Sequence, residues 1–479
     1  MPVTVYPRSH WLRSLYVLVT AAVASSCTLG PDYKRPVVEV PASYRHADAA
    51  AADANAAQSL ADVKWFDLFQ DPTLTQLVTS ALKQNFDVRI AAERVLQARA
   101  LFRITRADQF PEVGASVDAI GTRISTTGAN RAIPRGIDPA VYYAQAGFNL
   151  GWELDVWGRL RRLSESARAQ YFATEEARRG VITTLVGDVI ETYLRLRALD
   201  LELEIAQRTR DVATEGLRLT QARRDRGVAS ALDVRQAEQL LYIATGQIAS
   251  VERELAETEN ALSLLLGQVP GDVPRGLELE AFKVPPTVPA GLPSALLERR
   301  PDIRQAEQEL IAANAQIGAA KAEYFPRISL TGFLGAQSRA LTDLLTGSAA
   351  TWTAGVGAAV PIFNAGRIGA NVQFTEAVQR ELVVNYQRAI YTALREVSDS
   401  LAAYRKTSEE RGEQERLVEA LDASARLSTQ RYEGGVDNYL QVLDAQRNLF
   451  QGELDLARLR QQELAAIVQL YRALGGGWS

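Results

Sequence analysis

Four segments of the chain alternate between apolar and polar residues, which is the pattern of β-strands with one apolar and one polar face. The clearest alternation runs from Tyr143 to Val156, where apolar residues from Ala144 onward are separated by single polar residues or glycines. Weaker alternations begin at Val113, Ile328 and Trp352. The pattern therefore predicts two β-hairpins, at about residues 113–157 and 327–362.

Strands of this kind fit two environments. Strands of about ten residues with one apolar face suit an outer-membrane β-barrel, but the same pattern suits a soluble antiparallel sheet that helices cover on one side. Four strands cannot close a membrane barrel, because the smallest have about eight strands and an open edge in lipid leaves backbone groups unpaired. The membrane interpretation therefore predicts that several chains share one barrel, with eight strands from two chains or twelve from three.

Two helical segments are unusually long. Residues 159–226 and 367–433 contain no proline, and about 65 helical residues would extend roughly 100 Å at 1.5 Å per residue. Each segment ends at glycine, Gly227 in the first and Gly434-Gly435 in the second. Helix-capping patterns follow, Ser230 with Asp233 and Asn438 with Gln441. We therefore expect each long helix to turn back into a second, antiparallel helix.

The helix after the first break carries an apolar stripe with the three-four spacing of coiled coils. A stripe of this kind indicates helix packing and no particular chemistry. The second copy holds the stripe less well, because Glu463 interrupts it. The first stripe comprises Val234, Ala237, Leu241, Ala244, Ile248, Val251, Leu255, Leu262 and Leu265.

The chain is internally duplicated, because four dipeptides recur at nearly constant spacing. Three recur 208 residues later (366−158, 435−227 and 474−266), and one recurs after 215 (325−110). We expect a first structural repeat at 71–267 and a second at 294–475, joined by a connector at 268–293 and followed by a tail at 476–479. The pairs are Gly158-Arg159 with Gly366-Arg367, Gly227-Val228 with Gly435-Val436, Leu266-Gly267 with Leu474-Gly475, and Phe110-Pro111 with Phe325-Pro326.

Composition excludes several classes of function. The 479 residues are 47% hydrophobic and carry a net charge of −4, which gives no support to nucleic-acid binding. Two histidines, one cysteine and no glycine-rich phosphate loop leave no metal site, catalytic triad or nucleotide cradle to suggest. We therefore expect neither an enzyme nor a cofactor.

The N-terminus is typical of a secretory signal, predicted at residues 1–26. Arg8 and Arg13 precede a short apolar run, which ends in small residues just before Cys27. Cys27 resembles the lipid-modified cysteine of a bacterial lipoprotein, although Ala24 stands where such signals usually carry leucine. A free thiol is the alternative. Acyl chains such as palmitate would anchor the extended segment 27–70 to a membrane without spanning it.

Several motifs resemble the TolC-type outer-membrane efflux channels, in particular the OprM-like lipoprotein branch that works with resistance-nodulation-division (RND) pumps. They run nearly the length of the mature chain. The motifs are residues 27–36 (CTLGPDYKRP), 65–74 (WFDLFQDPTL), 297–303 (LERRPDI), 322–326 (AEYFP), 360–367 (VPIFNAGR) and the segment 431–447.

This resemblance implies an α+β membrane protein. It would be a homotrimer whose twelve-stranded outer-membrane β-barrel, with four strands per chain, continues into a twelve-helix periplasmic α-barrel. The proline-rich connector would lie in a belt around the helical part. The resemblance also implies a passive exit duct for drugs and other small amphiphiles, with a periplasmic adaptor (membrane fusion) protein and an inner-membrane RND pump as partners. A duct for type I protein secretion is the alternative within this class, and a non-porous lipid-anchored strut is the alternative outside it.

The resemblance further implies an iris-type gate at the periplasmic end. Tyr432 matches a tyrosine of the closing network, Asp233 matches an aspartate that pairs with it, and Asp444 matches the aspartate that rings the narrowest point. Leu440 lies four residues before Asp444 and so faces the same side of the helix. Asp437 stands where some members carry an arginine, a departure that implies a different pairing scheme in this chain.

Each gate residue also has a structural interpretation. In that interpretation, Asp233 is only a helix cap, Tyr432 only packs at a turn, and Asp444 is a solvated surface carboxylate. The turns at the periplasmic tip are the expected contacts with the adaptor, through Gly227, Val228, Gly434, Gly435 and Val436.

Overall fold

The computed structural model describes residues 28–45, 59–63, 65–125, 138–283 and 291–476. The expected signal at 1–26, the lipidation candidate Cys27 and the last three residues of the expected tail lie outside the described residues. The chain divides into two compact units. Unit 1 comprises residues 1–36, 96–173 and 307–385, and unit 2 comprises residues 37–95, 174–306 and 386–479.

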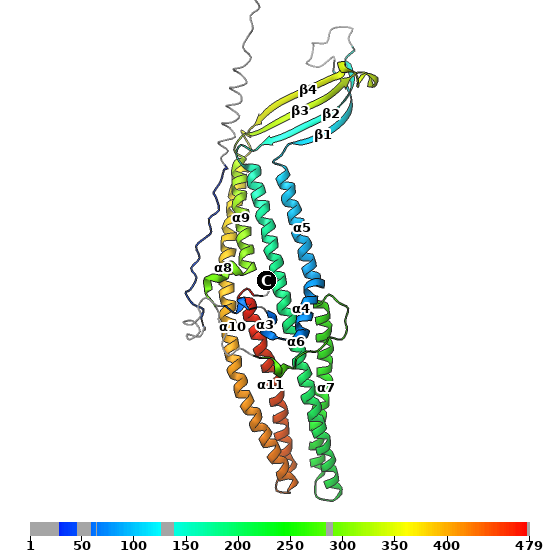
Figure 1. The fold of residues 1–479 in the computed structure, drawn as a ribbon, viewed down its shortest axis with the longest axis vertical. Coiled ribbons are helices and arrows are strands. Elements are labelled where there is room, and N and C mark those ends of the chain that lie inside the picture. The colour runs from blue at the N-terminus through cyan, green and yellow to red at the C-terminus, as the bar shows by residue number, and fades with distance from the viewer. Residues whose placement is uncertain (1–27, 46–58, 64, 126–137, 284–290, 477–479) are drawn as a thin grey trace, which may run out of the picture. The chain divides into compact units, whose positions relative to one another are not determined.

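Unit 1 contains an antiparallel sheet of four strands in the order β1-β2-β3-β4 (Figure 1). The strands lie where the alternating segments predict them. Two 3₁₀ turns, η4 (Leu341–Asp343) and η5 (Gly347–Ala349), lie between the last two strands. The strands are β1 (Glu112–Arg123), β2 (Ala140–Leu154), β3 (Arg327–Ser338) and β4 (Ala350–Ala359).

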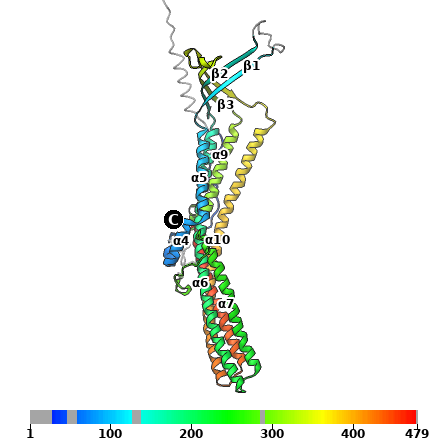
Figure 2. The same cartoon turned by 90° about the vertical axis from the view of Figure 1, so that its right-hand side faces the viewer.

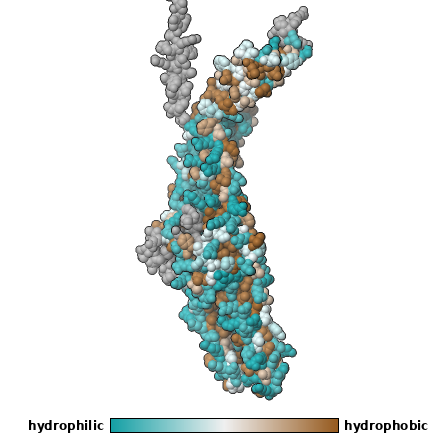
Figure 3. Space-filling view, turned by 45° about the vertical axis from the view of Figure 1, so that its right-hand side comes forward, coloured by the Kyte–Doolittle hydropathy of each residue, from teal (hydrophilic) through white to brown (hydrophobic). Residues whose placement is uncertain are grey.

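The register of the sheet brings apolar residues from all four strands together on one face. Phe148 of β2 lies opposite Leu334 of β3, and Leu334 lies opposite Trp352 of β4. The other face is richer in small and polar residues, such as Gln145 opposite Asp118, but it also carries Phe333. Apolar side chains gather over the strands (Figure 3), and Phe148, Leu334 and Trp352 are 61%, 65% and 73% exposed. A water-soluble sheet would bury these side chains, so their exposure favours a lipid-facing surface.

The helices occur in pairs of equal length, as the internal duplication predicts. α5 and α9 have 22 residues each, α6 and α10 have 67 each, and α7 and α11 have 35 each. Within the described ranges, no helix is long and apolar enough to cross a bilayer. The longer helices are α4 (Pro72–Gln84), α5 (Phe86–Ala107), α6 (Arg159–Asp225), α7 (Ala231–Leu265), α9 (Pro301–Ala322), α10 (Arg367–Glu433) and α11 (Tyr439–Ala473). The short ones are η1 (Leu60–Asp62), α3 (Trp65–Phe69), η2 (Leu279–Ala281), η3 (Pro293–Ala295) and α8 (Leu296–Arg299).

In unit 2, α6, α7, α10 and α11 run side by side (Figure 2). One buried cluster contains residues of all four helices, among them Ala213, Leu240, Tyr432 and Val442. The predicted stripe on α7 is buried at Val234, Ala237, Ala244, Val251 and Leu262, and Leu240, which the predicted stripe does not include, is also fully buried.

The buried residue that interrupts the stripe on α11 has a charged partner. Glu463 is 1% exposed, and its Oε2 accepts a 2.6 Å hydrogen bond from Nε of Arg411 on α10. A buried carboxylate is costly unless it is paired, so this ion pair explains how α11 continues through a charged position in its apolar stripe.

The predicted breaks at Gly227 and Gly435 have the same backbone geometry. Both glycines have φ of +76°, a conformation that residues with a Cβ rarely adopt. The amides that follow each long helix bond back in the Schellman pattern, Val228 to the carbonyl of Arg223 and Val436 to that of Arg431, both at 2.9 Å. Each long helix therefore ends by the same mechanism.

Candidate functional site

Tyr432 and Tyr439 form a buried aromatic pair beside the turn between α10 and α11. Their ring centroids are 5.2 Å apart in an edge-to-face arrangement, and the guanidinium of Arg223 lies 4.5 Å from the Tyr432 centroid. Within the described part of the chain, neither hydroxyl has a hydrogen-bond partner. Burial raises the pKa of Tyr439 to about 12, so its phenol is neutral at physiological pH. Tyr432 thus packs at the turn in the single chain.

Asp233 caps α7, as its spacing from Ser230 predicts. Its Oδ2 accepts hydrogen bonds from the Ser230 amide at 2.7 Å and the Ser230 hydroxyl at 2.9 Å. The Asp233 amide in turn donates to the Ser230 hydroxyl at 3.2 Å. Because the Tyr432 hydroxyl has no bonding partner among the described residues, its expected pairing with Asp233 is not formed within one chain.

Leu440 and Asp444 lie one turn apart on α11 and are both exposed. One carboxylate oxygen of Asp444 accepts a 3.4 Å hydrogen bond from the amide nitrogen of Asn448. The two side chains share a side of the helix, as their spacing predicts. This placement is compatible with a constriction ring and with a solvated surface carboxylate.

Asp437 pairs with a residue of its own turn. Nε of Arg431 donates to its Oδ2 at 2.5 Å, and this bond lowers the pKa of Asp437 from its ordinary value of 3.8. This pair was not predicted from the sequence, although the two residues lie on either side of the Gly434-Gly435 break. Asp437, at the position where the resemblance leads us to expect arginine in some members, is therefore an acid held by a local arginine.

The tips of both helical turns present an exposed apolar side chain. Val228 and Val436 are each 67% exposed, and each follows a positive-φ glycine. The structure therefore displays the same glycine-valine feature at two positions, as the duplication predicts.

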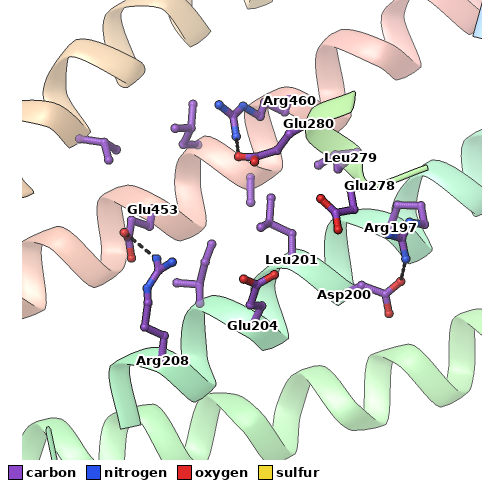
Figure 4. A pocket seen from close by; sticks show the side chains of 14 residues that line it. Arg197, Asp200, Leu201, Glu204, Arg208, Glu278, Leu279, Glu280, Glu453 and Arg460 are labelled. Atoms are coloured by element: carbon purple, nitrogen blue, oxygen red, sulfur yellow. Dashed lines mark hydrogen bonds and ion pairs between the residues drawn. The ribbon is translucent and has the colours of Figure 1, made fainter. Parts of the chain in front are cut away.

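A recess of about 400 Å³ in unit 2 is lined by α6, α11 and η2 (Figure 4). Its arginines are already paired with acids, Arg208 with Glu453 at 2.7 Å and Arg197 with Asp200 at 2.5 Å. Arg460 pairs with Glu280. Among the described residues, no group of three or more histidines, cysteines or carboxylates is placed to hold a metal ion. We interpret the recess as a structural feature lined by ion pairs within and between elements of unit 2.

A four-stranded sheet with an exposed apolar face, attached to long paired helices, defines a class of protein, the outer-membrane channels that extend into the periplasm. The family model described as "Outer membrane efflux protein" matches residues 77–268 and 292–476. The chain belongs to this family. Its members are transport ducts without enzymatic activity.

Proteins similar to this chain align with nearly all of its residues. The solvent efflux pump outer membrane protein SrpC of Pseudomonas putida is 42% identical over 461 residues, covering 95% of this chain and 96% of the relative. The antibiotic efflux pump outer membrane protein ArpC of Pseudomonas putida is 40% identical over 471 residues, covering 97% and 95%. The open-state crystal structure of the MtrE outer membrane channel of Neisseria gonorrhoeae is 30% identical. It superimposes with a TM-score of 0.84 and covers 95% of this chain and 99% of that one.

Proposed function

We propose that this channel is the exit duct of a tripartite efflux system and acts as a homotrimer. The observation that carries the proposal is the sheet of unit 1, whose apolar face is exposed and whose outer strands, β1 and β4, each have one neighbour in the sheet. Lipid does not tolerate unpaired strand edges. Three chains of four strands close a twelve-stranded barrel, which lies within the size range of outer-membrane barrels.

The polar face of the sheet would line the water-filled lumen. Ser116, Gln145 and Thr331 lie on that face. Transport through the barrel is passive, and the energy comes from an inner-membrane RND pump joined by a periplasmic adaptor. Small amphiphiles such as drugs and solvents are the proposed substrates, which agrees with the solvent and antibiotic efflux named for SrpC and ArpC.

The periplasmic end would close as an iris. Leu440 and Asp444 form the constriction ring, with one leucine and one carboxylate from each chain. Tyr432 and Asp233 belong to the closing network, and the exposed valines of the two tips, Val228 and Val436, contact the adaptor. The support is that the ring and tip residues are exposed, on helices whose facing side chains, among them Tyr439 and Val442, are packed together.

Cys27 would carry acyl chains that anchor the mature chain in the outer membrane. The residues after it are held firmly: the Leu29 amide donates to the Trp157 carbonyl at 3.2 Å, and Arg162 donates to the Leu29 carbonyl at 3.1 Å. This attachment supports an anchor near the end of β2, where the proposed membrane border lies.

The two structural repeats, at 71–267 and 294–475 with the connector at 268–293, are also part of the proposal. The equal lengths of the paired helices support the division. Each repeat contributes one hairpin of barrel wall and one helical pair of the periplasmic tunnel.

Two measurements test the function. Purified protein in planar lipid bilayers should give single-channel currents, and its particles should have the mass of three chains. Deletion of the gene should make cells hypersensitive to amphiphilic drugs or solvents, and the wild-type gene should restore resistance. A monomer without current would indicate the strut, and lost protein secretion with unchanged drug sensitivity would indicate the secretion duct.

A further inference from the structure

Closing the proposed barrel creates a junction between chains that the single chain leaves incomplete. One end of the sheet contains Glu112 at the start of β1, Leu154 at the end of β2, Arg327 at the start of β3 and Ala359 at the end of β4. When antiparallel β4 of one chain pairs with β1 of the next, the residues after Ala359 meet the residues before Glu112. This inference rests on the proposed trimeric barrel.

The chain contains a template for that junction, because β2 already pairs with β3 in the same way. There, Trp157, which follows β2, lies against Phe325-Pro326, which precede β3. The ring centroids of Trp157 and Phe325 are 4.8 Å apart, and the indole N–H donates to the Pro326 carbonyl at 2.9 Å. An aromatic side chain of the first repeat thus covers the phenylalanine of the second.

At the corresponding junction between chains, the phenylalanine is present but this aromatic cover is absent. Phe110-Pro111 is the equivalent of Phe325-Pro326, but Ala365 stands at the position of Trp157 (157 + 208 = 365). Phe110 is 59% exposed, whereas the stacked Phe325 is 37% exposed. Beside Phe110 is a recess of about 760 Å³, lined among others by Ile104, Trp152, Leu160 and Leu163.

Phe363, two residues before Ala365, cannot cap its helix as the equivalent residue of the first repeat does. In the first repeat, Asp155 caps α6 by accepting from the amides of Leu160 at 3.0 Å and Arg161 at 2.8 Å. Phe363 occupies the equivalent position (155 + 208 = 363) and cannot accept such bonds. Phe363 and its neighbour Ile362 are each 89% exposed, which is unfavourable in water.

We infer that Phe363 of one chain inserts into the recess beside Phe110 of the next chain, so that a second copy of this protein is the occupant of the recess. The contact buries two exposed phenylalanines together. At the junction between chains it has the role that the Trp157–Phe325 stack has within one chain. Both residues belong to unit 1, and pairing of β4 with β1 brings them to the same end of the barrel.

A cysteine pair tests the contact directly. Phe363→Cys combined with Phe110→Cys, in a chain whose natural cysteine is Cys27 alone, should give covalent dimers and trimers on mild oxidation or with a short bismaleimide. Phe363→Cys combined with Leu345→Cys is the matched control. Leu345 is 97% exposed but lies between β3 and β4 at the other end of the strands, so this pair and the wild-type chain should stay uncrosslinked.

The outcome separates this inference from the proposed function. Trimers that conduct current but do not crosslink through positions 363 and 110 would overturn the contact and leave the channel intact. Absence of trimers in the wild-type protein would overturn both.

A stability measurement gives an independent check. Phe363→Ala should lower the temperature at which detergent-resistant trimers separate, Phe363→Trp should retain most of the resistance, and Phe110→Ala should add little to Phe363→Ala because the two share one contact. Leu345→Ala is the control for loss of an exposed apolar side chain. Equal trimer stability in Phe363→Ala and wild-type protein contradicts the inference.

Discussion

Arg431 and Asp437 are joined across the glycine turn at the tip of the second helical pair, with 2.5 Å between Nε and Oδ2. The last turn of α10 and the residue just before the cap of α11 are thus tied by one charge-assisted hydrogen bond. The first helical pair lacks this tie, because Arg223 and Ala229 stand at the equivalent positions (431−208 and 437−208). The two tips therefore share a backbone geometry but differ in how the turn is held.

Replacement of Asp437 by Asn should loosen the second turn selectively. Arg431 would lose its ionised acceptor, so amides 434–438 should exchange with deuterium faster, while amides 226–230 of the first turn stay unchanged. Glu413→Gln, which breaks an exposed pair with Arg416 inside α10, is the matched control and should alter neither turn. Equal protection of the second turn in Asp437→Asn and wild-type protein would show that glycine geometry alone holds it.

The same pair should give the second turn a pH dependence. The bond from Arg431 lowers the pKa of Asp437 in the folded chain below its ordinary value of 3.8. A lowered folded pKa contributes stability that is present above the ordinary value and is lost as the pH falls through the folded value. Exchange at the second turn should therefore be steady from neutral pH down to about pH 4 and accelerate only below it, after correction for intrinsic exchange rates. The Asp437→Asn variant should lack this transition.

The proposed gate predicts a larger conductance when the side chains of the constriction ring are shortened to alanine. Leu440→Ala with Asp444→Ala removes the bulk and the charge of two exposed residues on one side of α11, so single-channel conductance in planar bilayers should rise. Because both side chains are exposed, the stability of the folded chain should change by no more than about 0.5 kcal/mol. Arg447→Ala, at another exposed position of α11, is the control. Unchanged conductance in the double variant would place the constriction elsewhere.

The sequence predicts the elements of this fold well because their signals are local. A period of two sets which side of its own strand each of Phe148, Leu334 and Trp352 lies on, and absence of proline with a following glycine sets the extent of α6 and α10. The register between strands, which brings the three onto one face of the sheet, is not a local signal. The pairs that hold the elements together are less predictable. Glu463 looks like a defect until Arg411 of a neighbouring helix is placed beside it. The gate is harder still, because its geometry depends on residues of other chains.

Asp71 and Tyr193 show how far such pairs can lie from one another in sequence. Asp71 is 2% exposed and caps α4, and its Oδ2 accepts from the Tyr193 hydroxyl at 2.9 Å and the Leu277 amide at 3.1 Å. The same hydroxyl accepts from the Gly276 amide at 2.8 Å. Burial raises the pKa of Tyr193 well above its usual range, so the neutral phenol is the donor. One carboxylate and one phenol thus hold the connector against α4 and α6.

Tyr193→Phe should destabilise unit 2, because it leaves the Gly276 amide without its acceptor. The expected loss in free energy of unfolding is about 1–3 kcal/mol, the usual range for an unsatisfied buried group, measured by denaturant unfolding of the detergent-solubilised protein. Tyr242→Phe is the matched control, since Tyr242 is 66% exposed. Similar stability of the two variants would mean that water replaces the lost hydroxyl.

The N-terminal strap, residues 28–36, yields the last prediction. Arg162, whose side chain is 5% exposed, donates to the Leu29 carbonyl at 3.1 Å and to Asp32 at 2.8 Å. Arg162→Ala should release the strap and speed trypsin cleavage after the exposed Lys34, about tenfold for every 1.4 kcal/mol of lost attachment. Asp32→Ala should act weakly, because the Asp32 side chain is 86% exposed and exposed ion pairs contribute little. Cleavage in Arg162→Ala that is no faster than in Asp32→Ala would show that the hydrogen bonds of Tyr33 and Arg35 to Glu307 suffice to hold the strap.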